Sequence, residues 1–118
     1  MHALELGEME LRFAEIIWKH APIASGELVK LCEAAFSWKK STTYTMLRRL
    51  IDRGIFASED SIVRVVMTRA EFDARRSEQF VFEQFGGSLP AFLTAFTARK
   101  KLSEKEIDAL RRIIEEGK

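Results

Sequence analysis

Hydrophobic residues recur at helical spacing near the start of the chain. Residues 6–20 are predicted to form a first helix, whose single face would consist of Leu6, Met9, Phe13, Ile16, Ile17 and His20. Gly7 with Glu10 three residues later is half of a capping box, so the helix is expected to start there. Pro22 ends the segment.

Two further helices follow from the same periodicity. The second runs from Ala24 or Ser25 to Phe36, and its predicted apolar face is Leu28, Leu31, Cys32, Ala35 and Phe36. The third covers residues 40–53 and stops at Gly54, a residue type typical of helix ends. Its predicted buried side is Thr43, Leu47, Leu50 and Ile51.

The pattern then changes from helical to extended. Residues 55–59 and 62–67 are rich in β-forming residues and are separated by Asp60-Ser61, which predicts a hairpin that packs its apolar face on the helices. Three helices followed by a hairpin is the order of a winged helix-turn-helix. The predicted fold is therefore mainly α with a small β-hairpin wing, and residues 1–68 form a DNA-binding domain.

Residues 69–118 return to helical spacing and are predicted to form a C-terminal dimerisation region. A helix starts at Arg69 and is broken by Gly86-Gly87, Ser88 caps a short helix over residues 89–98, and Ser103 opens a capping box before a last helix. This segment is more apolar than a winged domain needs, which favours self-association over a ligand pocket. The expected dimer contacts are Phe80, Phe82, Phe85, Leu89, Phe92, Phe96, Leu110 and Ile114.

The composition excludes several classes of function, because the residues that they require are few or missing. The 118-residue chain has one cysteine, Cys32, which is expected to be a small buried side chain and allows neither an internal disulfide nor a multi-cysteine metal site. No apolar run is long enough to span a membrane and no signal peptide is recognisable, so we expect a cytoplasmic protein without membrane contact. The chain has two histidines and no phosphate-binding glycine loop, so neither an enzyme nor a cofactor is expected.

Charge is uneven along the chain, although the total is only +1. Residues 37–53 contain five basic side chains against Asp52 alone, whereas residues 1–36 are acidic and the remainder is balanced. In a helix-turn-helix the third helix enters the major groove, where basic residues neutralise phosphates and hydroxyls reach base edges. The predicted contacts to double-stranded DNA are Lys39, Lys40, Ser41, Thr42, Tyr44, Thr45, Arg48, Arg49, Arg53 and the wing residue Arg64.

An alternative is a winged-helix module that binds another protein rather than DNA. It would use Phe56, the wing and Trp38 as its surface, with the basic helix merely solvated. Trp38 lies just ahead of the third helix and is expected to be a packing anchor. An interaction face should also be richer in exposed apolar side chains than this helix is.

These residues resemble the penicillinase and methicillin-resistance repressor family of bacterial winged-helix proteins, which also includes copper-responsive repressors. The most specific match is residues 38–50 (WKKSTTYTMLRRL) with Arg53-Gly54, which is similar to the family's recognition-helix signature. Weaker matches are the start at residues 6–10 with Trp18, then Pro22 with Glu27, and the segments 85–89 and 102–111. The resemblance implies a homodimeric transcriptional repressor that binds an inverted-repeat operator.

Individual positions follow or depart from that family pattern. Thr42, Thr45 and Arg49 match it and would lie at the DNA, whereas Ser41 and Tyr44 differ from the commoner residues. Antibiotic-responsive members are cut at an Asn-Phe bond where this chain has Ala95-Phe96, and the paired cysteines of copper-responsive members are missing. Neither family signal therefore transfers to this chain, and an unknown inducer or regulatory protease is left open.

Overall fold

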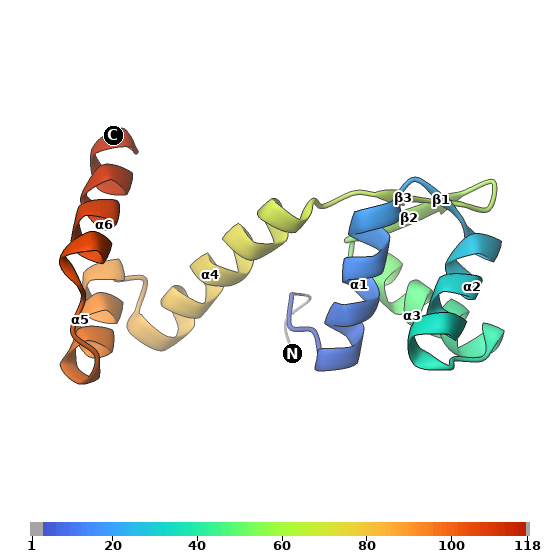
Figure 1. Cartoon of the computed structure of the whole chain (residues 1–118), viewed down its shortest axis with the longest axis horizontal. Coiled ribbons are helices and arrows are strands. Elements are labelled where there is room, and N and C mark those ends of the chain that lie inside the picture. Colours follow the sequence, from blue (N-terminus) through green and yellow to red (C-terminus); the bar gives the residue numbers. More distant parts are fainter. Residues whose placement is uncertain (1–3, 118) are drawn as a thin grey trace. The chain divides into compact units, whose positions relative to one another are not determined.

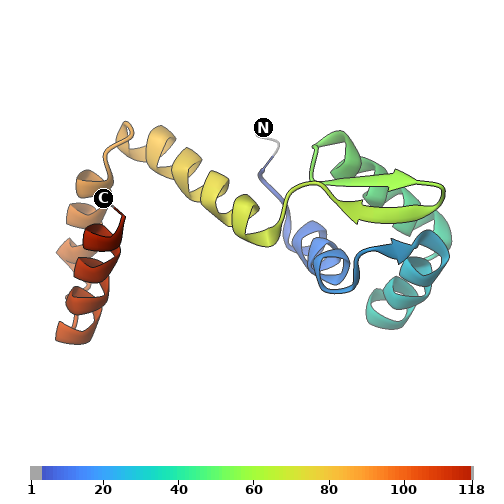
Figure 2. The ribbon, with the colours of Figure 1, turned by 90° about the horizontal axis from the view of Figure 1, so that it is seen from above.

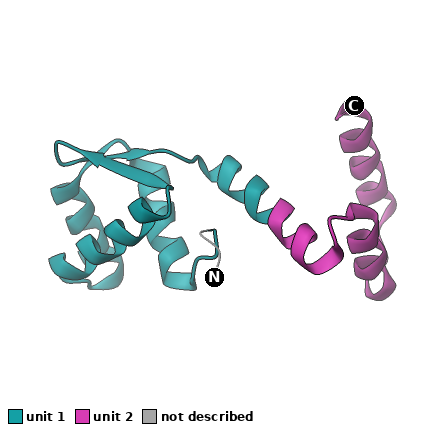
Figure 3. Cartoon of the chain, turned by 180° about the vertical axis from the view of Figure 1, so that it is seen from behind, with its two compact units in different colours: residues 1–77 teal, residues 78–118 magenta. Residues whose placement is uncertain are grey.

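The computed structural model describes residues 4–117 and has the predicted class, a mainly helical chain with a small antiparallel sheet (Figure 1). It divides into two compact units, the first ending at Ser77 and the second beginning at Glu78 (Figure 3). The elements in chain order are α1 (Glu8–His20), β1 (Ile23–Ala24), α2 (Ser25–Phe36), α3 (Lys40–Asp52), β2 (Phe56–Glu59), β3 (Ile62–Val65), α4 (Arg69–Phe85), α5 (Leu89–Arg99) and α6 (Glu104–Glu116).

Helix α1 confirms the predicted start but corrects the predicted face. Gly7 is the N-cap, and the Glu10 carboxylate accepts a hydrogen bond from its amide at 3.0 Å. The side chains of Met9 and His20 are exposed, and the helix instead buries Ala14 between Phe13 and Ile17. The buried face of α1 is therefore centred on Phe13, Ala14 and Ile17, and Met9 and His20 lie outside it.

Helices α2 and α3 lie where the periodicity places them. The exception on α2 is Ala35, which is exposed, whereas Leu28 and Cys32 are buried as predicted. Helix α3 buries Thr43, Leu47 and Leu50. Gly54 follows it with φ of +79°, a backbone conformation that glycine adopts without steric cost.

The hairpin is part of a three-stranded sheet rather than a free ribbon. Strands β2 and β3 pair antiparallel, with Phe56 opposite Val65 and Glu59 opposite Ile62. Strand β1, which the sequence analysis did not predict, pairs with the other edge of β3 and gives the order β1-β3-β2. The sheet lies along one side of the three helices, and β2 and β3 run beside α3 (Figures 1 and 2).

One hydrophobic core holds the first unit together. Phe72, near the start of α4, is fully buried in it, so the first turns of α4 pack on the winged domain. Trp18 lies at its edge, 5.6 Å from the ring of Phe56 and 5.3 Å from that of Phe72. The other large members are Phe13, Ile17, Leu28, Leu47, Leu50, Ile55, Val63 and Met67.

The second unit has a different character, because none of its described residues is buried. Helix α4 is broken at Gly86 and Gly87, Ser88 caps α5, and Ser103 and Glu106 form the capping box of α6, all as predicted. Four phenylalanines, Phe80, Phe85, Phe92 and Phe96, contact one another with ring centroids 5.4 to 6.2 Å apart.

The residues expected at a dimer contact are therefore at the surface of this unit. Phe85, Phe92 and Leu110 are half-buried, and the others are exposed: Phe80, Phe82, Leu89, Phe96 and Ile114.

Candidate nucleic-acid interface

Helices α2 and α3 form the helix-turn-helix, and the turn between them is fixed by aromatic packing. Ser37 ends α2 in the left-handed conformation, with φ of +58°. The ring of Trp38 then lies 4.7 Å from that of Phe36 and 5.6 Å from that of Phe13. Trp38 is thus a packing anchor, as expected, and it sets where α3 begins.

The two faces of α3 differ sharply in burial. Its inner face is apolar apart from Thr43, whereas the opposite face is exposed over two turns. Seven of the predicted DNA contacts share this exposed face or its start, and Tyr44, 38% exposed, completes the set. The seven are Lys39, Lys40, Ser41, Thr42, Thr45, Arg48 and Arg49.

Six of these eight side chains line two hollows beside the helix, and Lys39 and Lys40 line neither of them. One has a volume of about 250 Å³ and is lined by Ser41, Thr42, Thr45, Met46 and Arg49. The other, of about 550 Å³, lies between α3, the start of α2 and the hairpin, and is lined by Ser25, Tyr44, Leu47, Arg48, Ile51, Ser58, Asp60 and Ser61. Sequence reasoning missed the hydroxyls of Ser25, Ser58 and Ser61, because they come from three separate elements.

Hydrogen bonds within the site determine which atoms of Thr45 and Tyr44 are available to a ligand. The Thr45 hydroxyl donates to the Ser41 carbonyl at 2.9 Å, so its oxygen is left as an acceptor. The Tyr44 hydroxyl donates to the Ser25 hydroxyl at 3.4 Å, and the Lys40 ammonium lies 5.8 Å from the Tyr44 ring. Tyr44 is thus held from both sides, against α2 and within α3.

Arg53 does not join this face. Its guanidinium lies 3.2 Å from the Glu10 carboxylate and donates to the Glu5 carbonyl at 3.0 Å, so it ties the end of α3 to the start of α1. Arg64 lies on β3 between the buried Val63 and the exposed Val65, so its exposed side chain is on the outer face of the sheet. It lines neither hollow of α3.

Phe56 and Cys32 are both buried, against the expectation for Phe56 and in agreement with that for Cys32. Phe56, the expected anchor of a protein-binding surface, is only 1% exposed, because it packs on Trp18 in the core. Cys32 is fully buried, and this burial raises the pKa of its thiol, an effect that the neighbouring Thr43 hydroxyl opposes more weakly. A protonated, inaccessible thiol has the chemistry of a packing residue.

Other kinds of site are not found in the described part of the chain. Among residues 4–117, no three His, Cys, Asp or Glu side chains gather as a metal site requires. Within the same range, no helix is both long and apolar enough to cross a membrane.

Sequence comparison with known proteins identifies the family. The sequence pattern of the penicillinase repressor family matches residues 6–116, nearly the whole chain. The chain belongs to the penicillinase repressor family. It is 29% identical to the penicillinase repressor of Bacillus licheniformis, over 97% of this chain and 92% of that protein. It is 23% identical to the methicillin resistance regulatory protein MecI of Staphylococcus aureus, over 93% of both chains.

As a member of this family, the chain is a DNA-binding transcriptional repressor related to bacterial repressors. Its winged-helix architecture agrees with this membership. The family is a regulatory one. In this repressor the exposed face of α3 carries hydroxyl, lysine and arginine side chains.

Proposed function

We propose that this repressor binds an inverted-repeat operator as a homodimer, with one α3 helix in the major groove of each half-site. Residues 1–68 supply the DNA contacts and residues 69–118 the contacts between the two copies. The observation that carries the proposal is the exposed face of α3, where the hydroxyls of Ser41, Thr42 and Thr45 are followed by Arg48 and Arg49, beside Lys39 and Lys40.

Each kind of side chain on this face has a distinct role in the proposal. Lys39, Lys40 and Arg48 neutralise phosphates, which gives affinity without sequence information. Thr45 and Arg49 border the same hollow as Ser41 and are placed to meet base edges, where hydroxyl and guanidinium groups distinguish base pairs. Arg53 is left out of this set because Glu10 holds it.

The dimer is supported by the second unit. Residues 78–117 expose seven large apolar side chains and bury none, and a segment of this size does not stabilise itself without an interior. A second copy supplies the missing partner surface, and a twofold dimer matches the symmetry of an inverted repeat.

The first experiment is selection of bound duplexes from a random DNA pool at near-physiological salt. We expect an inverted repeat whose half-sites lie about one helical turn apart. Recovery of no motif, with weak binding that salt abolishes, would contradict specific operator recognition.

Substitutions on α3 then test the assignment of the surface. Arg48→Ala and Arg49→Ala should each weaken operator binding by about 1–3 kcal/mol, because each removes a contact to phosphate or base. Arg111→Ala is the matched control, since Arg111 is 65% exposed on α6, where it pairs with Asp108. Equal losses in all three variants, measured by fluorescence anisotropy, would count against α3 as the DNA surface.

A further inference from the structure

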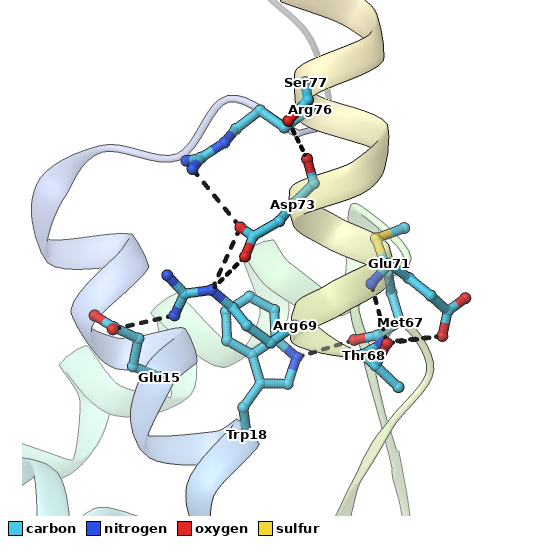
Figure 4. Close-up of polar contacts among 9 residues, drawn as sticks. All are labelled: Glu15, Trp18, Met67, Thr68, Arg69, Glu71, Asp73, Arg76 and Ser77. Atoms are coloured by element: carbon cyan, nitrogen blue, oxygen red, sulfur yellow. Dashed lines mark hydrogen bonds and ion pairs between the residues drawn. The ribbon is translucent and has the colours of Figure 1, made fainter. Parts of the chain in front are cut away.

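The junction between the winged domain and α4 contains the most connected group of polar side chains in the described first unit (Figure 4). At its centre is Arg69, the first residue of α4. Its guanidinium donates to the Glu15 carboxylate of α1 at 3.1 Å and to Asp73, one turn further along α4, at 3.3 Å. The same group lies 5.3 Å from the ring centre of Trp18.

The neighbours of Arg69 are fixed in turn. The Trp18 indole donates to the Met67 carbonyl at 2.9 Å, which holds the segment that leads into α4 against α1. Arg76 pairs with Asp73 at 3.7 Å and lies 5.0 Å from the ring of Phe72. The hydrogen bond to Glu15 is the main cause of a raised pKa at Arg69.

We propose that Arg69 is a positioning residue for operator recognition, because its contacts to Glu15 and Trp18 fix the direction in which α4 leaves the winged domain and thereby the half-site spacing that the dimer accepts. This inference rests on the proposed dimeric binding to an inverted repeat. Arg69 itself need not touch DNA.

The length of α4 explains why a small contact at its base matters. Helix α4 continues without a break from its buried anchor Phe72 to Phe85, a rise of about 20 Å. A tilt of about 10° at Phe72 moves the far end by ~3.5 Å, which is close to the ~3.4 Å that separates successive base pairs. Phe72 fixes the position of α4 on the core, but a single side chain does not fix its angle.

The ion pairs around Arg69 are partly exposed to solvent, so their loss should affect the direction of α4 more than the stability of the fold. The side chains of Arg69, Glu15 and Asp73 are 42%, 49% and 47% exposed, and ion pairs of this kind contribute little to folding. Removing Arg69 should therefore leave the fold and the dimer intact while α4 samples more directions. The measurable effect is then on selectivity for spacing and not on stability.

The test compares the selected operator with versions whose half-site spacing is changed by one or two base pairs. We expect the wild-type protein to bind the altered operators about tenfold less tightly, and Arg69→Ala to reduce this preference to about twofold. Glu15→Gln should do the same from the other side of the ion pair. The double variant should be no less selective than Arg69→Ala alone, since Arg69→Ala already removes the contact to Glu15.

Arg75→Ala is the matched control. It removes the same charge from the same helix, and Arg75 makes none of the ion pairs or ring contacts found among the described residues. It should keep the wild-type spacing preference. Arg69→Lys keeps the charge and should restore part of the preference that Arg69→Ala loses.

Several outcomes would overturn the role of Arg69. These are an equal loss of affinity at every spacing, an unchanged preference in Arg69→Ala or Glu15→Gln, or the same broadening in Arg75→Ala. A wild-type protein that binds no inverted repeat at all contradicts the proposed function instead, so the two failures are distinguishable. Thermal unfolding and sedimentation of each variant show whether fold and dimer are retained.

Discussion

Arg53 shows how one side chain changes its role between sequence and structure. It belongs to the basic run of residues 37–53 and to the match with the family signature, so it was expected to contact DNA. Its partner Glu10 lies on another helix, far away in the sequence, and no local pattern pairs the two. The side chains of Arg53 and Glu10 are only 22% and 15% exposed, so the pair is a partly buried link between α1 and α3.

Arg53→Ala should therefore lower the free energy of unfolding by about 1–3 kcal/mol, because it leaves the Glu10 carboxylate without this partner. The dependence of DNA binding on salt should keep its slope, whereas Arg49→Ala should make the slope shallower by about one unit. Chemical denaturation and salt titrations measure the two effects. A shallower slope without loss of stability in Arg53→Ala would return Arg53 to the DNA surface.

At the scale of elements, helix starts are where local sequence is most informative. The starts at Gly7 and Ser103 were predicted from a glutamate three residues later, and both capping interactions are present. The start of α4 uses the same device, because the Thr68 hydroxyl accepts from the Glu71 amide at 3.1 Å and the Thr68 amide donates to Glu71 at 3.3 Å. This box was not predicted, because Thr68 was placed at the end of the DNA-binding domain and the helix was expected to start at Arg69.

Thr68→Ala should destabilise the protein by about 1 kcal/mol, since it removes the hydroxyl that caps the first turn of α4. Thr68→Ser keeps that hydroxyl and should cost much less. Urea denaturation followed by circular dichroism measures both. Equal losses would show that the methyl group of Thr68, rather than its cap, provides the stability.

The strand β1 marks the limit of what periodicity can predict. It has two residues, which is too short for an alternating pattern, and it exists because its backbone pairs with Val63 and Ile62 of β3. The exposed face of α3 was predictable because the 13 residues of this helix carry a clear helical repeat. The hydroxyls that join it from α2 and the hairpin were not, since only the folded chain brings Ser25, Ser58 and Ser61 together.

At the scale of the whole molecule, the two units differ in how they are stabilised. The first has a closed core around Phe13 and Phe72, whereas the second buries no described residue. Phe82 is the extreme case, because 70% of it is exposed and it makes no ring contact with the other described phenylalanines. The proposed dimer gives such side chains a partner.

Phe82→Glu should convert the dimer to monomers, because a charge would be buried at the contact between copies. The loss of operator binding should accompany it, while the first unit stays folded. Gln84→Glu is the matched control, since it adds the same charge to an exposed position two residues further along α4. Analytical ultracentrifugation measures the assembly, and a Phe82→Glu variant that remains dimeric would place the contact elsewhere.

The missing interior of residues 78–117 also bears on how long each chain survives in the cell. A newly made copy that has not met its partner exposes phenylalanine, leucine and isoleucine side chains of the kind that chaperones and proteases recognise. In the proposed dimer a second copy would cover these side chains and remove the signal for degradation. Degradation would then remove unpaired copies first, so the amount of repressor in the cell would depend on the rate of pairing as well as on the rate of synthesis.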